Sequence, residues 1–300
     1  MKLRFSKMEG LGNDFIVINA VTQFIADAKR EKLFSERYIR QLSDRHFGVG
    51  FDQMLVVEPP VHPTSDFHYR IFNADGSEVG NCGNGARCFA RFVQQEKLTY
   101  KNEIVVDIMG GAQTLTLQVN MNKTVTVNMG APIFDAASIP VDPSQAQQRE
   151  ILEPAPAEKL SLELDGQTYD FVCVSMGNPH AVAVVDSIRE TPVKQLGHLV
   201  QQHPCFPESV NVGFMQILDT REVLLRVYER GAGETMACGT GACAAIVAGQ
   251  CLGLLDDGVT ARLRGGELNI DFAFDSGYDP EAPVMMTGPA RTVFVGQLIL

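Results

Sequence analysis

The sequence predicts an α/β (mixed α+β) protein built from two pseudo-symmetric domains. Its 300 residues exceed what one hydrophobic core usually serves, so about two domains are expected. Strand-like runs and helical patterns alternate in both halves of the chain. A cysteine motif also occurs once in each half, as CGNGA at 82–86 and CGTGA at 238–242, which are 156 positions apart. Such self-similarity favours a duplicated fold.

The first half is predicted to contain seven strands and two helices. Alternating or β-branched runs predict the strands, and longer runs of helix-forming residues predict helices at about Ser35–Arg45 and Asn84–Gln95. The predicted strands are Lys2–Met8, Phe15–Ala20, Gln53–Val57, His68–Phe72, Ile104–Ile108, Thr114–Val119 and Thr124–Asn128.

The second half is predicted to repeat this mixture after a linker. Five prolines and the polar run DPSQAQQR give Ala131–Ala157 the composition of a linker or long loop. Helices are expected at about Val193–Gln202 and Thr240–Leu252. The predicted strands are Phe171–Ser175, Ala181–Val185, Val223–Tyr228, Thr260–Leu263, Glu267–Ala273 and a last strand at Arg291–Val295.

Composition and charge argue against nucleic acid and membrane as partners. Acidic residues outnumber basic ones by 36 to 25, and no Lys/Arg cluster is dense enough to neutralise a phosphate backbone. The first ten residues lack the uninterrupted apolar core of a signal peptide. The longest apolar stretch, around Ala242–Leu255, is broken by Gln250 and glycines and is too short to span a bilayer. We therefore expect a cytoplasmic protein.

The seven cysteines argue against both a disulfide framework and a metal site. An odd number cannot all pair, and a cytoplasmic chain of this length seldom carries disulfides. Neither Cys82/Cys88 nor Cys238/Cys243 has CxxC spacing, and the six histidines are scattered without ligand spacing. We expect no bound metal.

The paired motif offers a reactive thiol and an anion cradle in one element. Its glycines let the backbone approach a ligand closely, and the residues that follow favour a helix. A helix that begins there directs N–H groups and partial positive charge at a carboxylate, and it lowers a thiol pKa from its usual ~8.5. Cys82 and Cys238 are therefore predicted to be reactive, and a pseudo-twofold axis would make them face each other. We interpret the other five cysteines as small buried hydrophobes.

Four blocks of sequence resemble the diaminopimelate epimerase family, in order along nearly the whole chain. They are MEGLGNDFIVIN (8–19), NADGSEVGNCGNGARCFARFV (73–93), MGNPHAV (176–182) and ERGAGETMACGTGACAA (229–245). The resemblance implies two domains, each a mixed sheet wrapped around a central helix. It places residues 1–126 and 287–300 in the first domain and 127–286 in the second, so that the last strand completes the first sheet.

The resemblance also implies an activity and a set of site residues. The family interconverts L,L- and meso-diaminopimelate without pyridoxal phosphate, as a homodimer, on the route to lysine and peptidoglycan. Cys82 and Cys238 match its acid/base pair, and His180 and Glu229 match residues that assist them. The substrate-contacting positions are Asn13, Gln53, Asn73, Gly83, Asn84, Asn178, Asn211, Arg230, Gly239 and Thr240.

Two other hypotheses remain open at this point. Another epimerase of the same fold, such as a proline racemase, typically has Cys-Gly-His at its first cysteine, whereas Cys82 is followed by Gly-Asn. A thiol redox or metal-binding protein is the alternative from a different class, and the missing CxxC argues against it.

Overall fold

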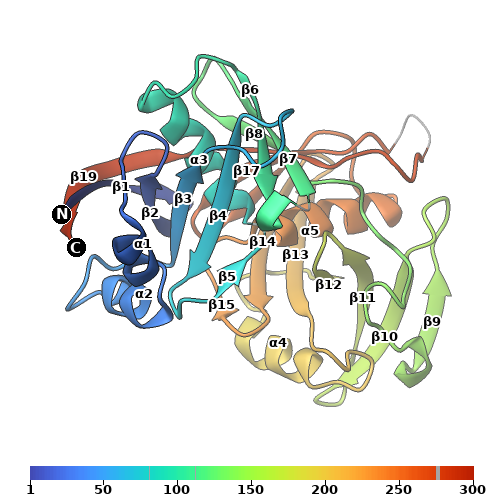
Figure 1. Ribbon diagram of the computed structural model, residues 1–300. Coiled ribbons are helices and arrows are strands. Elements are labelled where there is room, and N and C mark those ends of the chain that lie inside the picture. Colours follow the sequence, from blue (N-terminus) through green and yellow to red (C-terminus); the bar gives the residue numbers. More distant parts are fainter. Residues whose placement is uncertain (81, 112, 275–277) are drawn as a thin grey trace. The chain divides into compact units, whose positions relative to one another are not determined.

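The computed structural model describes residues 1–80, 82–111, 113–274 and 278–300 (Figure 1). Two compact units divide the chain. Unit 1 comprises Met1–Asn128 and Thr287–Leu300, and unit 2 comprises Met129–Met286. The two units are described separately below.

Unit 1 is a mixed sheet with three helices. β1 pairs antiparallel with both β2 and β19, β2 is parallel to β3, and β4 is antiparallel to β3 and parallel to β6. Its strands are β1 (Lys2–Gly10), β2 (Asn13–Asn19), β3 (Gln53–Glu58), β4 (Phe67–Asn73), β5 (Glu78–Val79), β6 (Glu103–Ile108), β7 (Gln113–Val119), β8 (Val125–Asn128) and β19 (Arg291–Ile299). Its helices are α1 (Asp27–Leu33), α2 (Glu36–Ser43) and α3 (Gly83–Gln95), and β18 (Met285–Gly288) crosses the unit boundary.

Helix α3 is the central helix of unit 1. It contacts β1, β2, β3, β7, β8 and β19, and its Phe89 ring lies 4.7 Å from the Tyr69 ring. Along β2 and β3, alternate side chains point to opposite faces. Phe15 and Leu55 face α3, whereas the neighbouring side chains join the cluster that includes residues of α1 and α2. The first cysteine motif is thus held by a helix that packs against the sheet.

Unit 2 repeats this plan. β9 to β14 pair in sequence order, followed by β16 and β17, with parallel pairs at β12/β13 and β14/β16. The strands are β9 (Gln148–Ile151), β10 (Glu158–Leu164), β11 (Gln167–Ser175), β12 (Pro179–Val184), β13 (Asn211–Asp219), β14 (Glu222–Glu229), β15 (Gly233–Glu234), β16 (Val259–Leu263) and β17 (Gly266–Asp271). The helices are α4 (Val193–Gln201) and α5 (Gly239–Cys251).

Helix α5 is buried almost all round because its sequence, GTGACAAIVAGQC, is dominated by small residues. It contacts six strands, from β11 to β17, while Phe214 of β13 lies in the cluster formed with α4 on the opposite face. At its far end the buried Gln250 donates to the Phe272 carbonyl at 2.9 Å. Helix α5 is therefore fixed along its length and at its last turn.

The predicted α/β class is confirmed, with several local differences. The predicted linker contains β9, and Ile139 and Val141 within it are buried in the core of unit 2. Strands β5, β10, β13, β15 and β18 were not predicted. The pattern of β13 is interrupted by Gly213, which lies between Val182 of β12 and Leu225 of β14. Helix α1, seven residues long with one buried side chain, Leu33, was also not predicted. No helix within the described ranges is both long and apolar enough to cross a membrane.

Candidate active site

Cys82 occupies the residue before the first turn of α3. Its backbone is extended, with φ −152° and ψ 108°, and its sulfur accepts a hydrogen bond from the Gly85 N–H at 3.4 Å. Gly85 must be small, since a Cβ there would lie 2.4 Å from the Tyr69 hydroxyl. The helix start therefore directs backbone N–H groups toward the thiol, as the motif predicts.

Two amide side chains lie at this helix start, and two more lie on the neighbouring strands β3 and β4. Asn13, at the start of β2, places Oδ1 4.0 Å from Cys82 Sγ, and Asn84 Nδ2 donates to the same oxygen at 3.5 Å. Gln53 and Asn73 are cross-strand partners on β3 and β4, joined by a 2.9 Å hydrogen bond. Of the predicted substrate residues of the first half, Asn13 and Asn84 thus lie beside Cys82, Gln53 and Asn73 pair across β3 and β4, and Gly83 opens α3.

Two charged residues that the sequence analysis did not predict hold these amides. Asp52 accepts from Asn13 Nδ2 at 2.8 Å, and Arg87 donates to Asn84 Oδ1 at 2.9 Å. Arg87 has no exposed surface. An arginine within the apolar face of a predicted helix was the sequence signal for it, because arginine is seldom fully buried without a partner.

Cys238 occupies the same position before α5 in unit 2. Its backbone is extended, with φ −123° and ψ 112°, and its sulfur lies 3.6 Å from the Thr240 hydroxyl. A Cβ on Gly241 would come within 3.2 Å of that sulfur and 3.0 Å of Val227. Glycine at the third helical position therefore leaves room for the thiol in unit 2, and Gly239 begins the helix.

Burial reverses the expected pKa effect at Cys238. The helix start predicts a lowered thiol pKa, but desolvation, followed by the negative charge of Glu229, raises the pKa of Cys238 well above its usual value. The Thr240 hydroxyl opposes this shift. Glu229 is itself held by a short hydrogen bond from Thr235 Oγ1. The unliganded site therefore keeps Cys238 protonated at neutral pH.

His180 is completely buried and neutral at physiological pH. Desolvation, reinforced by the positive charge of Arg230, lowers its pKa to about 3. Nε2 lies 3.0 Å from Asn178 Oδ1, and Nδ1 has no hydrogen-bond partner among the described residues. As an uncharged imidazole, His180 can therefore donate one hydrogen bond and accept another.

Asn211 links the β12–β13 region to the residue that follows β14. Its Nδ2 donates to the Pro179 carbonyl at 2.9 Å, and its Oδ1 accepts from the Arg230 backbone at 2.9 Å. The Arg230 guanidinium donates to the Glu208 carbonyl at 3.1 Å and is otherwise exposed. Unit 2 thus positions an exposed guanidinium directly after Glu229.

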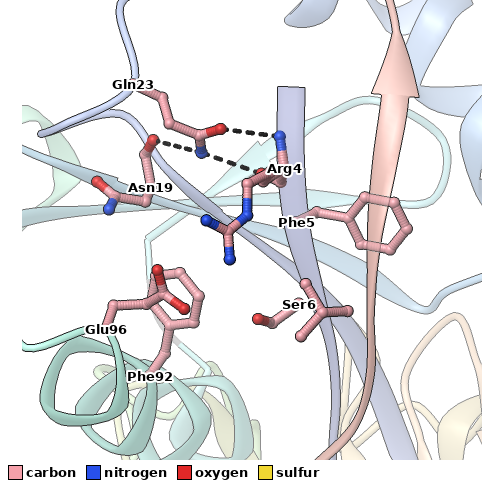
Figure 2. Close-up of a pocket in the computed structure, with 8 residues that line it drawn as sticks. Arg4, Phe5, Ser6, Asn19, Gln23, Phe92 and Glu96 are labelled. Carbon is pink, nitrogen blue, oxygen red and sulfur yellow. Dashed lines mark hydrogen bonds between the residues drawn. The ribbon is translucent and has the colours of Figure 1, made fainter. Parts of the chain in front are cut away.

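Other parts of the described chain offer less chemistry. No set of three or more His, Cys, Asp or Glu side chains within these residues is close enough to hold a metal ion. A cavity of about 10 Å³ in unit 1 contains none of the predicted site residues (Figure 2). Gln23 closes one side of it through hydrogen bonds to both backbone groups of Arg4.

The fold is shared with solved structures of racemases and epimerases. A probable proline racemase from Agrobacterium radiobacter K84 matches with a TM-score of 0.67 at 16% identity, over 99% of this chain and 93% of that one. A hydroxyproline epimerase from Agrobacterium vitis matches with a TM-score of 0.66 at 15% identity, over 100% and 93%. At these identities the likeness shows the fold alone.

Sequence comparison identifies the family. The diaminopimelate epimerase family model matches residues 5–134 and 172–293. Diaminopimelate epimerases from Teredinibacter turnerae and Stutzerimonas stutzeri are 51% and 50% identical over the full length of both chains. The chain belongs to the diaminopimelate epimerase family.

Proposed function

We propose that Cys82 and Cys238 are the two bases of a cofactor-independent epimerase that converts L,L-diaminopimelate to the meso isomer for lysine and peptidoglycan synthesis. The observation that carries this proposal is their equivalence. Each cysteine precedes the central helix of its own unit, with an extended backbone and a glycine three residues later. The family match supplies the substrate.

Two thiols are well suited to inverting the configuration of an α-carbon. One cysteine, as thiolate, removes the α-hydrogen, and the other, as thiol, delivers its own proton to the opposite face. The pair ends with its protonation states exchanged, so the two groups titrate as a coupled unit. An α-hydrogen is far less acidic than a thiol, so the negative charge that develops must be stabilised. The N–H groups at the starts of α3 and α5, including those of Gly83, Asn84, Gly239 and Thr240, provide such donors for the α-carboxylate.

The remaining predicted residues have supporting roles in this proposal. Glu229 adds negative charge beside Cys238 and so favours the protonated form that must donate. His180 offers a neutral, buried hydrogen-bonding group. The Arg230 guanidinium binds the distal carboxylate with two hydrogen bonds, which favours a two-headed amino acid over proline. The amides proposed to hold the distal amine and the backbone of the substrate are those of Asn13, Gln53, Asn73, Asn178 and Asn211.

We also infer a homodimer that works in the cytoplasm. On β19, alternate residues Val293, Val295 and Ile299 are 56%, 55% and 80% exposed, an apolar stripe that a second copy could cover. Reactive thiols require a reducing compartment. Light scattering of the wild type and of Val295→Lys tests the dimer, and a monomeric wild type contradicts it.

The decisive experiment is incubation of L,L-diaminopimelate with the protein and no added cofactor, followed by separation of the stereoisomers. Cys82→Ala and Cys238→Ala should each abolish epimerisation, because each direction needs both groups. Cys205→Ala, which removes a buried thiol outside both motifs, is the matched control and should retain activity. Substantial epimerisation by either motif variant would contradict the two-base assignment.

A further inference from the structure

Each of the two amides beside Cys82 is hydrogen-bonded to a charged side chain, one to a carboxylate and the other to a guanidinium. Asn13 Nδ2 lies 2.8 Å from Asp52 Oδ2, and Asn84 Oδ1 lies 2.9 Å from Arg87 Nη2. A carboxylate only accepts hydrogen bonds and a guanidinium only donates them. Each partner therefore favours one of the two orientations that an amide alone leaves open.

The two amides are also hydrogen-bonded to each other, and all the hydrogen bonds of this set run in one direction. Asn84 Nδ2 donates to Asn13 Oδ1 at 3.5 Å, so the donors run from Arg87 through Asn84 and Asn13 to Asp52. Asn13 Oδ1 also lies 4.0 Å from Cys82 Sγ and can accept the S–H hydrogen. Together these four residues form a directed chain that presents a carbonyl oxygen to the thiol.

Both ends of the directed chain are anchored outside it. Asp52 also accepts from the Asp14 backbone at 3.0 Å and from Arg45 at 2.8 Å. Arg45 and Lys7 in turn bind Asp14, and these hydrogen bonds outweigh burial and hold the Asp14 pKa well below its usual range. Arg87 is fully buried and donates to the Pro289 carbonyl at 3.1 Å.

The second half of the repeat lacks this device. Cys243 and Thr240 stand at the positions equivalent to Arg87 and Asn84, and Glu229 stands at the position equivalent to Asn73. In unit 2 the Glu229 carboxylate acts on the Cys238 thiol, whereas in unit 1 the amide oxygen of Asn13 lies beside the Cys82 thiol.

We propose that Arg87 and Asp52 are positioning residues that together fix Asn13 with its carbonyl oxygen toward the Cys82 sulfur and so favour the protonated thiol in the empty site. Either anchor alone opposes reversal in part, because turning Asn13 alone would place two donors, and turning Asn84 alone two acceptors, against each other at Asn84–Asn13. Removing both anchors lets both amides turn, so that Asn13 presents an N–H group to the Cys82 sulfur. The significance for epimerisation rests on the proposed function, but the positioning itself does not.

The test is the pH dependence of Cys82 alkylation by iodoacetamide, followed by mass spectrometry of the Cys82 peptide. The variants are Asp52→Ala, Arg87→Met and their combination. Asp66→Ala is the matched control, since Asp66 also accepts from a backbone N–H and a cation but contacts neither amide. Tyr69, Cys88 and Glu9, the other titratable groups that interact with this region, stay unchanged in every variant.

We expect the double variant to lower the pH midpoint of alkylation by about one unit, more than the two single shifts combined. Asp52→Glu and Arg87→Lys, which keep the acceptor and the donor, should stay near the wild-type midpoint. Additive shifts, a raised midpoint or equal effects of the conservative variants would overturn the proposal.

Two further measurements keep the result interpretable. If Arg87→Met does not fold, the smaller downward shift expected of Asp52→Ala decides alone, because the Asp52 side chain is 42% exposed and its loss leaves the core intact. A midpoint equal to that of Asp66→Ala then overturns the proposal. The alkylation assay needs no substrate, so a wild type without epimerase activity would refute the proposed function and leave this test valid. In an active enzyme the double variant should lose kcat more than it raises KM.

Discussion

Gly85→Ala probes how tightly unit 1 encloses the first cysteine loop. The new Cβ would lie 2.4 Å from Tyr69 Oη, 3.3 Å from Leu55 and 3.4 Å from Phe15. The hydroxyl cannot move into solvent, because Tyr69 is 1% exposed and its ring packs against Phe89 at 4.7 Å. Overpacking of this kind typically costs 1–3 kcal/mol, so we expect a loss of about 2 kcal/mol. If the 300 residues unfold together, with an unfolding entropy of about 2.1 cal/mol/K per residue, that loss lowers Tm by about 3 °C.

A double-mutant cycle isolates the contact. Tyr69→Phe removes an oxygen that has no hydrogen-bond partner among the described residues, so it should be neutral or stabilising and should restore most of the loss in the Gly85→Ala background. Gly213→Ala is the control, since its Cβ would meet nothing closer than 3.5 Å. Thermal and urea unfolding give the free energies. If Gly85→Ala is as stable as wild type, or if Tyr69→Phe gives no rescue, the packing argument is wrong.

Four other predictions concern the chemistry. In deuterated solvent, early product should carry deuterium at the inverted carbon while unreacted substrate stays protiated; transfer of the substrate's own hydrogen would rule out separate bases. Arg230→Lys should lower kcat/KM for diaminopimelate roughly tenfold or more, because an ammonium cannot form two parallel hydrogen bonds, and unchanged kinetics would remove that role. Glu229→Gln removes the charge that helps raise the Cys238 pKa, so peptide-resolved alkylation of Cys238 should begin at lower pH; an unshifted profile would contradict the coupling. His180→Gln should flatten the loss of stability as pH falls from about 6.5 toward 3.

Folding lowers the His180 pKa from 6.5 to about 3, so between these values the unfolded chain binds more protons than the folded one. Stability is thus fully present above pH 6.5 and falls with acidification, by up to about 1.4 kcal/mol per pH unit from this group. Urea unfolding at several pH values measures the slope, and equal slopes for the wild type and the variant would contradict the assignment.

The local sequence pattern predicted α3 and α5, the helices that follow the two cysteines, because a glycine-rich turn followed by helix-forming residues determines where each helix begins. It could not predict what packs around them. Asp52 and Arg87 reach the amides only through the arrangement of the sheet and α3, and the raised pKa of Cys238 depends on burial and on Glu229. Strand β13 was missed because Gly213 interrupts its pattern, although β12 and β14 enclose that glycine.

The enclosure of α5 limits how this half of the molecule can change. Strands and loops surround a helix of mostly small side chains, and Gln250 ties its last turn to the Phe272 carbonyl. A larger residue, or one residue inserted between Cys238 and Cys251, would have to rotate the helix about 100° or push strands apart. The thiol's direction is therefore among the least adjustable properties of unit 2. Under the proposed function, a change of substrate preference has more room at the strand ends, where Asn178 and the exposed Arg230 can be exchanged without moving Cys238.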